Sequence, residues 1–329
     1  MKFLIAGYGS IGRRHFQNLK ALGQEDILFF RSGKGQLEDK GLDGFIVETE
    51  IDAALRHKPD AVIISNPTAL HMDVAIPAAK AGCHLLLEKP ISHSMDDVEE
   101  LQDAVAQSGS RVLVGFQLRY HPGLQKIAEW LSLGKLGEPL FGYAHWGEYL
   151  PDWHPWEDYR KGYSARDDLG GGVVLTLSHP FDYLNWLLGP VETVSAATQL
   201  STSLDIGVED RADIVLKHSQ GTQINVHLDY LQKPPSHTLE LVLSKGMLRW
   251  DASNTQVQIY HSESEKWETV SLSEEFERND LFLSQMSHFI EVVAGATPAC
   301  TLADGILALE IALAVHESAK TGRKTRMGH

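Results

Sequence analysis

The chain has 329 residues, 43% of them hydrophobic and 22% charged, a composition typical of a soluble globular protein large enough for two domains. Its formal net charge of -15 argues against nucleic acid or an anionic membrane as the main partner. Cys83 and Cys300 provide neither a disulfide framework nor a metal-ligand spacing, so no metal is expected. The N-terminal apolar run is too short for a signal peptide, and no run approaches the ~20 apolar residues of a membrane span. A cytoplasmic protein is expected.

The first predicted element is a buried strand over residues 3–6, and a glycine-rich segment follows it directly. The segment Gly7-Tyr8-Gly9-Ser10-Ile11-Gly12 leads into a helical pattern that stops at Gly23. A GxGxxG sequence alone is weak evidence, but a strand before it and a helix after it are the context that a dinucleotide requires. In that context Gly7 permits the tight turn, Gly9 lets the pyrophosphate approach the backbone, and Gly12 lets the helix pack on the strand. We expect cofactor contacts from Gly7, Gly9, Ser10, Ile11 and Gly12.

The next predicted strand, over residues 27–30, ends in Arg31 and Ser32. An NAD enzyme usually places Asp or Glu at this strand end to hold the ribose hydroxyls. Arginine and serine suit a 2′-phosphate, because a guanidinium makes paired charge-assisted hydrogen bonds to it. NADP is therefore favoured as the cofactor and NAD is the alternative. An Arg31 that is exposed to solvent or covers the adenine is the other interpretation.

Strands and helices continue to alternate until residue 116, which is typical of a doubly wound parallel sheet and predicts a dinucleotide-binding domain over residues 1–119. One of these strands ends at Lys89, which Pro90 follows. Ligands in open parallel sheets lie at the carboxyl ends of the strands, and the proline restricts the backbone of the lysine before it. On this stretch alone, a surface lysine in an ordinary turn is the more frequent explanation.

From residue 120 the pattern changes to long strands with two-residue alternation, which predicts a second, α+β domain over 120–329 with a large, mostly antiparallel sheet. A continuous helix over 173–188 is expected to cover one face of this sheet. The other face would stay bare in a monomer, so we expect a homodimer or homotetramer in which it packs against a partner subunit.

Two polar regions of this second part are candidates for chemistry. Residues 152–163 crowd aromatic, acidic and basic side chains without helix or strand periodicity, which suits a sugar or other polyol, and an interface loop or a lid is the equally weighted alternative. In the predicted helix, Thr176, His179 and Asp182 stand three apart and would share one face. A lone histidine there is more often a satisfied core residue than a catalyst, but a nearby lysine-bearing cofactor site shifts the balance toward catalysis.

Together these motifs resemble those of the Gfo/Idh/MocA family, the glucose-fructose oxidoreductase and inositol dehydrogenase group. The resemblance is carried by residues 7–12, by Asn66-Pro67-Thr68 with His71, by Glu88-Lys89-Pro90, and by the glycine-rich helix with His179 and Asp182. It spans nearly the whole chain. It implies a Rossmann domain joined to an open-faced sheet domain, and an NAD(P)-dependent dehydrogenase or reductase acting on the CH–OH group of a sugar, nucleotide sugar or cyclitol.

The resemblance also implies that Lys89 and His179 act at the reacting carbon. Asp182 joins them among the expected catalytic residues because of its spacing. The expected cofactor contacts, beyond the glycine segment, Arg31 and Ser32, come from Asn66, Pro67, Thr68, His71, Glu88 and Lys89. The expected substrate contacts come from Arg119, Tyr120, His154, Trp156, Tyr159, Arg160 and Thr176.

The sequence departs from the family pattern at Thr176, where many members carry an aspartate. Threonine holds no negative charge, so a carboxylate that orients His179 or Lys89 must come from elsewhere, and Asp182 is the candidate by spacing. Removing hydride from carbon requires a base for the hydroxyl proton, and burial beside a positive nicotinamide lowers the pKa of a lysine such as Lys89. Two alternatives stay open: a nucleotide-binding sensor of the same fold that has lost the reaction, and an enzyme that keeps its cofactor and passes hydride between two sugars.

Overall fold

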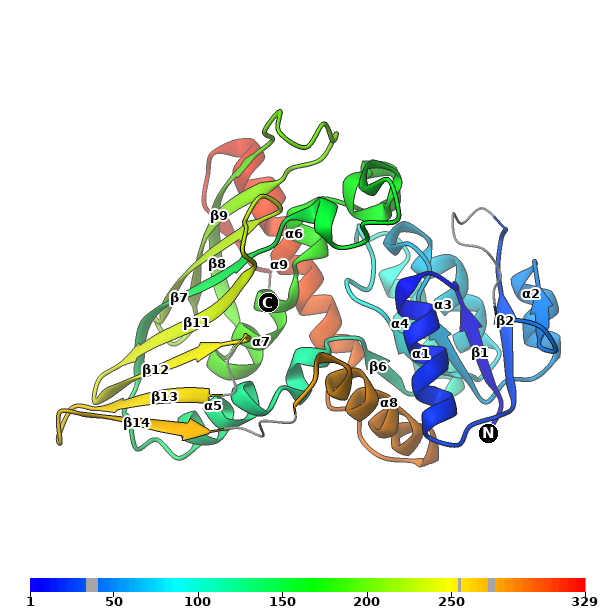
Figure 1. Cartoon of the computed structure of the whole chain (residues 1–329), viewed down its shortest axis with the longest axis horizontal. Helices are drawn as coiled ribbons and strands as arrows, with labels where there is room; N and C mark the ends of the chain where they lie inside the picture. The colour runs from blue at the N-terminus through cyan, green and yellow to red at the C-terminus, as the bar shows by residue number, and fades with distance from the viewer. Residues whose placement is uncertain (34–40, 254–255, 272–275, 329) are drawn as a thin grey trace. The chain divides into compact units, whose positions relative to one another are not determined.

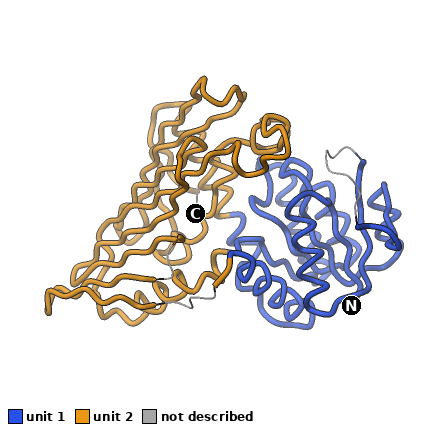
Figure 2. The backbone as a smooth tube through the Cα atoms, in the orientation of Figure 1, with its two compact units in different colours: residues 1–117, 278–306 blue, residues 118–277, 307–329 orange. Residues whose placement is uncertain are grey.

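The computed structural model describes residues 1–33, 41–253, 256–271 and 276–328. Within these ranges the chain forms two compact units, residues 1–117 with 278–306 and residues 118–277 with 307–329 (Figure 2). Residues 278–306 thus fold with the N-terminal unit, although they follow most of the second unit in sequence.

Unit 1 is built on a parallel sheet, six-stranded within the described residues, with the order β3-β2-β1-β4-β5-β6 (Figure 1). This is the order of a Rossmann sheet, and it confirms the predicted doubly wound fold. Four-residue runs of apolar side chains form the central strands, which are buried on both faces as a parallel sheet requires. The strands are β1 (Phe3–Ala6), β2 (Ile27–Phe30), β3 (Ile46–Glu48), β4 (Ala61–Ile64), β5 (His84–Leu87) and β6 (Val112–Val114).

The helices of unit 1 connect these strands and cover the sheet. They are α1 (Ser10–Ala21), α2 (Ile51–Arg56), α3 (His71–Lys80), α4 (Val98–Ser108) and α8 (Arg278–Ala294), with the short 3-10 helix η1 (Thr68–Leu70) between β4 and α3. Helix α8 packs against α1, and the rings of Phe289 and Phe3 lie 6.5 Å apart. Helix α9 (Leu302–Thr321) begins in unit 1 and continues into unit 2.

Unit 2 is built on a mixed sheet, nine-stranded within the described residues, with the order β14-β13-β12-β11-β7-β10-β9-β8-β15. In the part of the chain that is described, its strand pairs are antiparallel except for the parallel pair β7 and β10, so the predicted mostly antiparallel sheet is confirmed. The strands are β7 (Pro139–Gly147), β8 (Val191–Gln199), β9 (Arg211–His218), β10 (Gln223–Asp229), β11 (Ser236–Leu243), β12 (Gly246–Asp251), β13 (Gln256–His261), β14 (Lys266–Ser271) and β15 (Thr325–Arg326).

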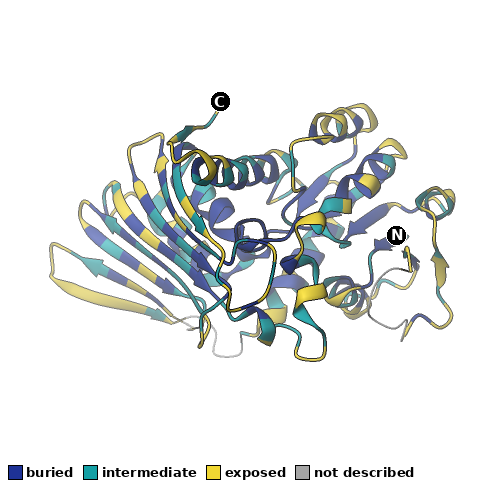
Figure 3. Ribbon diagram, turned by 90° about the horizontal axis from the view of Figure 1, so that it is seen from above, coloured by how far each residue is buried: buried dark blue, intermediate teal, exposed yellow. Residues whose placement is uncertain are grey.

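Alternation along the inner strands gives the sheet one buried and one open face, visible as stripes along those strands in Figure 3. In β7, Ala144 and Trp146 are buried, whereas Phe141 and Tyr143 are 42% and 51% exposed. The helices of this unit are α5 (Pro122–Ser132), α6 (Val173–Thr176) and α7 (His179–Leu188), and the 3-10 helices are η2 (Gln117–Tyr120), η3 (Leu150–Asp152), η4 (Tyr159–Lys161), η5 (Tyr163–Ala165) and η6 (Asp167–Leu169).

The predicted continuous helix over 173–188 is wrong. The chain forms α6, breaks at Leu177 and Ser178, and starts again as α7. Pro180 lies in the first turn of α7 and has no N–H to donate to the carbonyl of Thr176 four residues earlier, which removes a helical hydrogen bond at the break. His179 and Asp182 still share a turn, but Thr176 belongs to the separate helix α6.

Candidate active site

The glycine segment of unit 1 has the tight geometry that a dinucleotide loop needs. Gly7 has φ +94°, and a Cβ there would lie 2.6 Å from the backbone nitrogen of Asn66. A Cβ on Gly12 would lie 2.1 Å from the carbonyl oxygen of Gly7. A Cβ on Gly9 would meet no atom of the described residues within 4 Å, so the space in front of Gly9 is open to a ligand.

Gly9 is also the N-cap of α1, which has neither a side-chain cap hydrogen bond nor an acidic residue in its first turn. The positive end of the α1 dipole therefore faces the open space at Gly9, where it favours a phosphate. Ser10 and Ile11 form the first turn of this helix. The residues of this segment fit the pyrophosphate of a dinucleotide.

Two arginines gather around Tyr8, which lies between β1 and α1: Arg13 comes from α1 and Arg31 follows β2. The guanidinium carbons of Arg13 and Arg31 lie 4.9 and 5.8 Å from the centre of the Tyr8 ring. Partial burial lowers the pKa of Arg31, and the positive charge of Arg13 lowers it further. Two cations that repel each other favour an anion between them. Ser32 lies exposed beside them. Sequence reasoning missed Arg13, although it directly follows the last fingerprint glycine.

Glu88 and Lys89 directly follow β5, at the carboxyl edge of the sheet. One oxygen of the Glu88 carboxylate lies 2.8 Å from Nε2 of His15, whose side chain is fully buried in α1. The other oxygen accepts a hydrogen bond from the Lys89 backbone N–H at 3.3 Å. His15, which the sequence analysis did not single out, therefore fixes the carboxylate next to Lys89. Its position three residues after Gly12, on the buried face of α1, was the available signal.

The segment after β4 forms a second part of the same edge. Asn66 donates from Nδ2 to the carbonyl of Leu70 at 2.7 Å, Pro67 is the N-cap of η1, and Thr68, its first residue, is 3% exposed. His71 opens α3 and is 1% exposed. Since β1, β4 and β5 are parallel neighbours, the segments that follow them leave the sheet at one edge. Unit 1 thus brings together the segments that carry its predicted cofactor residues.

In unit 2, Arg119 and Asp182 bind each other. Nε of Arg119 donates to both carboxylate oxygens at 3.1 Å, and Nη2 donates to Oδ1 at 2.6 Å. Both side chains are buried, at 7% and 1% exposure. This pair ties η2, which also carries the half-buried Tyr120, to α7.

His179 is buried at the start of α7 and lies against the indole ring of Trp146, with ring centres 5.2 Å apart. The same indole stacks on His237 at 4.3 Å with an interplanar angle of 7°, and its Nε1 donates to Glu148 at 2.8 Å. Trp146, which sequence reasoning missed, therefore fixes the surface against which the imidazole of His179 lies. Thr176 is also buried, at 2% exposure.

The predicted substrate residues of the loop are partly engaged within unit 2. The hydroxyl of Tyr159 donates to the Leu204 carbonyl at 2.7 Å, and Arg160 pairs with Asp158 and Asp205. His154 and Trp156 have ring centres 5.4 Å apart, and Trp156 is 70% exposed. The loop therefore presents an exposed aromatic surface beside an acid-paired arginine.

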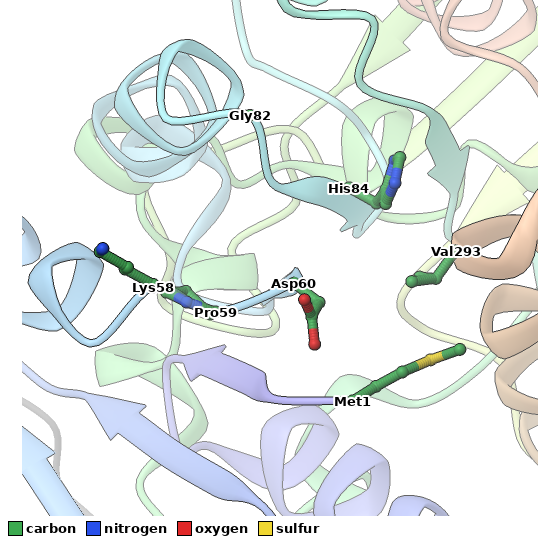
Figure 4. A pocket seen from close by; sticks show the side chains of 7 residues that line it. All are labelled: Met1, Lys58, Pro59, Asp60, Gly82, His84 and Val293. Carbon is green, nitrogen blue, oxygen red and sulfur yellow. The ribbon is translucent and has the colours of Figure 1, made fainter.

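The cavity shown in Figure 4 lies at the opposite edge of the unit 1 sheet, where β4 and β5 begin. It has a volume of about 540 Å³ and is lined by Met1, Lys58, Pro59, Asp60, Gly82, His84 and Val293. None of the predicted site residues lines it.

In the described ranges no three His, Cys, Asp or Glu side chains form a group that could hold a metal ion. A search of the described helices found none with the length and apolar character needed to cross a membrane.

Comparison with known proteins places this geometry in a family. Residues 1–116 match the oxidoreductase family with an NAD-binding Rossmann fold, and residues 124–249 match the GFO/IDH/MocA C-terminal domain.

Several curated proteins are similar to the chain. An uncharacterized oxidoreductase of Synechocystis is 33% identical over 46% of this chain, which spans 39% of that protein. A D-xylose 1-dehydrogenase (NADP(+)) of Haloferax volcanii is 27% identical, with 80% of this chain and 79% of the relative covered. A myo-inositol 2-dehydrogenase of Thermotoga maritima is 25% identical, with 99% and 98% covered.

Among solved structures, a levoglucosan dehydrogenase in complex with NADH and levoglucosan has the same fold, with a TM-score of 0.87, 17% identity and 99% of each chain covered. The two matched domains together span most of the chain, and the fold and the glycine segment agree with them. The chain therefore belongs to the Gfo/Idh/MocA family of NAD-binding oxidoreductases.

Proposed function

We propose that this oxidoreductase transfers hydride between NADP and a secondary alcohol or ketone of a sugar, nucleotide sugar or cyclitol. The observation that carries the proposal is the carboxyl edge of the unit 1 sheet, where the glycine segment, Asn66, Glu88 and Lys89 follow neighbouring strands. The relatives named for xylose and inositol support the substrate class.

Arg13 and Arg31 around Tyr8 support NADP over NAD. A 2′-phosphate would relieve the repulsion between the two guanidinium groups, whereas the bare ribose of NAD would not. The relative from Haloferax volcanii that is named for NADP(+) agrees with this preference. The levoglucosan dehydrogenase crystallised with NADH shows that the fold itself also accommodates the other cofactor.

In this proposal the glycine segment and Ser10 hold the pyrophosphate, while Asn66, Pro67, Thr68 and Glu88 border the nicotinamide end. When bound, the cofactor supplies a hydride acceptor or donor. Lys89 takes the hydroxyl proton during oxidation and returns it during reduction, a role typically worth about a hundred- to ten-thousand-fold in rate. His179, held against Trp146 in unit 2, is the second proposed catalytic residue. The pairing of Asp182 with Arg119 supports a role in fixing α7 for His179.

The loop of unit 2 is the proposed determinant of the substrate. The exposed ring of Trp156, with His154 beside it, suits stacking on the apolar face of a sugar ring. The remaining proposed contacts are Arg119, Tyr120, Tyr159, Arg160 and Thr176.

The test is to incubate purified protein with NADP or NAD and a panel of sugars, nucleotide sugars and inositols, following the absorbance of the reduced cofactor. We expect turnover with at least one substrate class and a higher kcat/KM with NADP. Tight cofactor binding without turnover across the panel would favour the sensor alternative. Reduced cofactor retained through purification would favour hydride exchange between two sugars.

We also propose that the open face of the unit 2 sheet packs against a second copy of the chain, giving a homodimer or homotetramer. Phe141, Tyr143 and Trp267 on this sheet are 42%, 51% and 44% exposed. Several large aromatic side chains exposed on one sheet are typical of a surface that binds another protein. Light scattering should detect an oligomer that Tyr143→Arg dissociates. A monomeric wild type would contradict this part of the proposal. A cytoplasmic location stays a prediction.

A further inference from the structure

His71 lies between two segments of the candidate site in unit 1. Its Nε2 is 3.0 Å from the carbonyl oxygen of Asn66, in the segment after β4, and its Nδ1 is 3.3 Å from the carbonyl oxygen of Ile91, in the segment after β5. The imidazole is 1% exposed. Both ring nitrogens thus face backbone carbonyls, which accept hydrogen bonds and do not donate them.

The surroundings of this ring decide which form it takes. Burial lowers the pKa of His71, and the facing carbonyls offset only part of that effect. The neutral imidazole has one N–H, so it donates to one of the two carbonyls at a time. The shorter distance favours the Nε2 tautomer, which donates to Asn66. In the other neutral tautomer Nδ1 carries the N–H and donates to Ile91, so each of the two contacts is a hydrogen bond in one neutral form of the ring.

We propose that His71 is a positioning residue that ties the segment after β4 to the segment after β5, fixing Asn66 and Lys89 relative to each other. The inference rests on the proposed function for the roles of these two residues. This positioning role takes the place of the direct cofactor contact that the sequence analysis expects of His71, because both ring nitrogens face the protein backbone. Asn66 supplies the carbonyl that faces Nε2, and Lys89 lies two residues before Ile91, so both functional residues are adjacent to a contact.

Two conservative variants separate the contacts. The side-chain amide of His71→Gln reaches as far as Nε2 and retains the donor to Asn66, whereas the shorter His71→Asn places a donor near Nδ1 and Ile91. His71→Leu removes both donors. The matched control is His218→Leu in unit 2, because His218 is also fully buried with a lowered pKa and faces one carbonyl, that of Gly189, at 2.7 Å from Nδ1.

The first readout is hydrogen–deuterium exchange of peptides covering residues 65–67 and 88–92, which needs no substrate. We expect faster exchange in both peptides for His71→Leu, mainly in 88–92 for His71→Gln, and mainly in 65–67 for His71→Asn. His218→Leu should leave both peptides unchanged. The second readout is the Kd for NADPH, which should rise about 3- to 10-fold in His71→Asn and less in His71→Gln, the range expected for one hydrogen bond.

The third readout is turnover, where kcat should fall more in His71→Gln than in His71→Asn. Equal exchange patterns in the Gln and Asn variants, or a folded His71→Leu protein with wild-type exchange in both peptides, would overturn the proposal. If His71→Leu does not fold, the Gln and Asn pair decides alone. A further outcome is that the Gln and Asn variants differ in exchange and in NADPH affinity as expected, but the wild type turns over no substrate. This outcome would refute the proposed function and support the positioning role.

Discussion

The carboxylate of Asp182 and the guanidinium of Arg119 form a buried ion pair through three hydrogen bonds, at 2.6 to 3.1 Å. The pair joins η2 to α7 and lies one helical turn from His179. Removing one partner leaves the other charge buried and uncompensated, which costs far more than the pair contributes to stability.

We therefore predict that Asp182→Ala lowers the free energy of unfolding by about 3–5 kcal/mol. The double variant Arg119→Met/Asp182→Leu should lose much less, because no unpaired charge remains in the interior. Chemical denaturation of the variants measures both values. If the free energy of unfolding of Asp182→Ala lies within about 1 kcal/mol of the wild-type value, the pair contributes no more than an exposed ion pair does. That result would show that the pair is hydrated in solution.

Two of the fingerprint glycines, Gly9 and Gly12, should respond differently to alanine. Gly9→Ala has room for its Cβ and ordinary φ, so its Tm should stay near wild type while the Kd for NADPH rises at least about tenfold, equal to 1.4 kcal/mol. Gly12→Ala collides with the Gly7 carbonyl and should lose stability whether or not cofactor is present. Thermal melts and fluorescence titration distinguish the two effects. Unchanged NADPH affinity in Gly9→Ala would move the pyrophosphate away from this segment.

Arg31→Ala should raise the Kd for NADPH by about ten- to a hundredfold and change the Kd for NADH little, because a charge-assisted pair to phosphate contributes about 1.5–3 kcal/mol. Arg13→Ala should also raise the Kd for NADPH and change the Kd for NADH little. Lys20→Ala, an exposed cation on the same helix, serves as the control. Equal losses for NADPH and NADH would mean that Arg31 contacts a part common to both cofactors, such as the adenine.

His121 should make the protein less stable in acid. It is 2% exposed, and burial lowers its pKa to about 4, below the 6.5 of an unfolded histidine. The unfolded chain therefore binds its proton first, so stability is complete above pH 6.5 and falls as the pH drops toward 4, by about 2 kcal/mol at pH 5.

His121→Asn retains an acceptor for the Gly123 N–H that His121 caps and removes the titrating ring. The variant should lose about 2 kcal/mol less stability than the wild type between pH 7 and pH 5, whatever its constant offset. Urea denaturation at both pH values measures this difference. Parallel losses in the two proteins would assign the acid sensitivity to other groups.

Much of unit 1 was predictable from the sequence because its signals are local. Apolar runs such as Phe3–Ala6 mark buried parallel strands, and the order of strand, glycine segment and helix identifies the dinucleotide edge. The partners of these residues were not predictable. Glu88 meets His15 across 73 positions, and the burial of a histidine on α1 does not by itself name the carboxylate that the histidine contacts.

Unit 2 shows a second limit. The spacing of Thr176, His179 and Asp182 suggested one helix face, but Pro180 interrupts the helix, and Asp182 pairs with a residue 63 positions away. The apolar pattern of a helix also does not show which of two sheets the helix packs on. Helix α8 folds with residues 1–117, although it follows most of unit 2 in the sequence.

The central claim is that Lys89 moves the substrate proton while hydride passes to or from NADP. Single-turnover measurement of hydride transfer in Lys89→Met, with the Kd for NADPH determined in parallel, tests it most directly. We expect the rate to fall by about a hundred- to ten-thousand-fold while NADPH affinity stays within about threefold. A wild-type transfer rate in a variant that binds cofactor normally would contradict the account and require another proton donor.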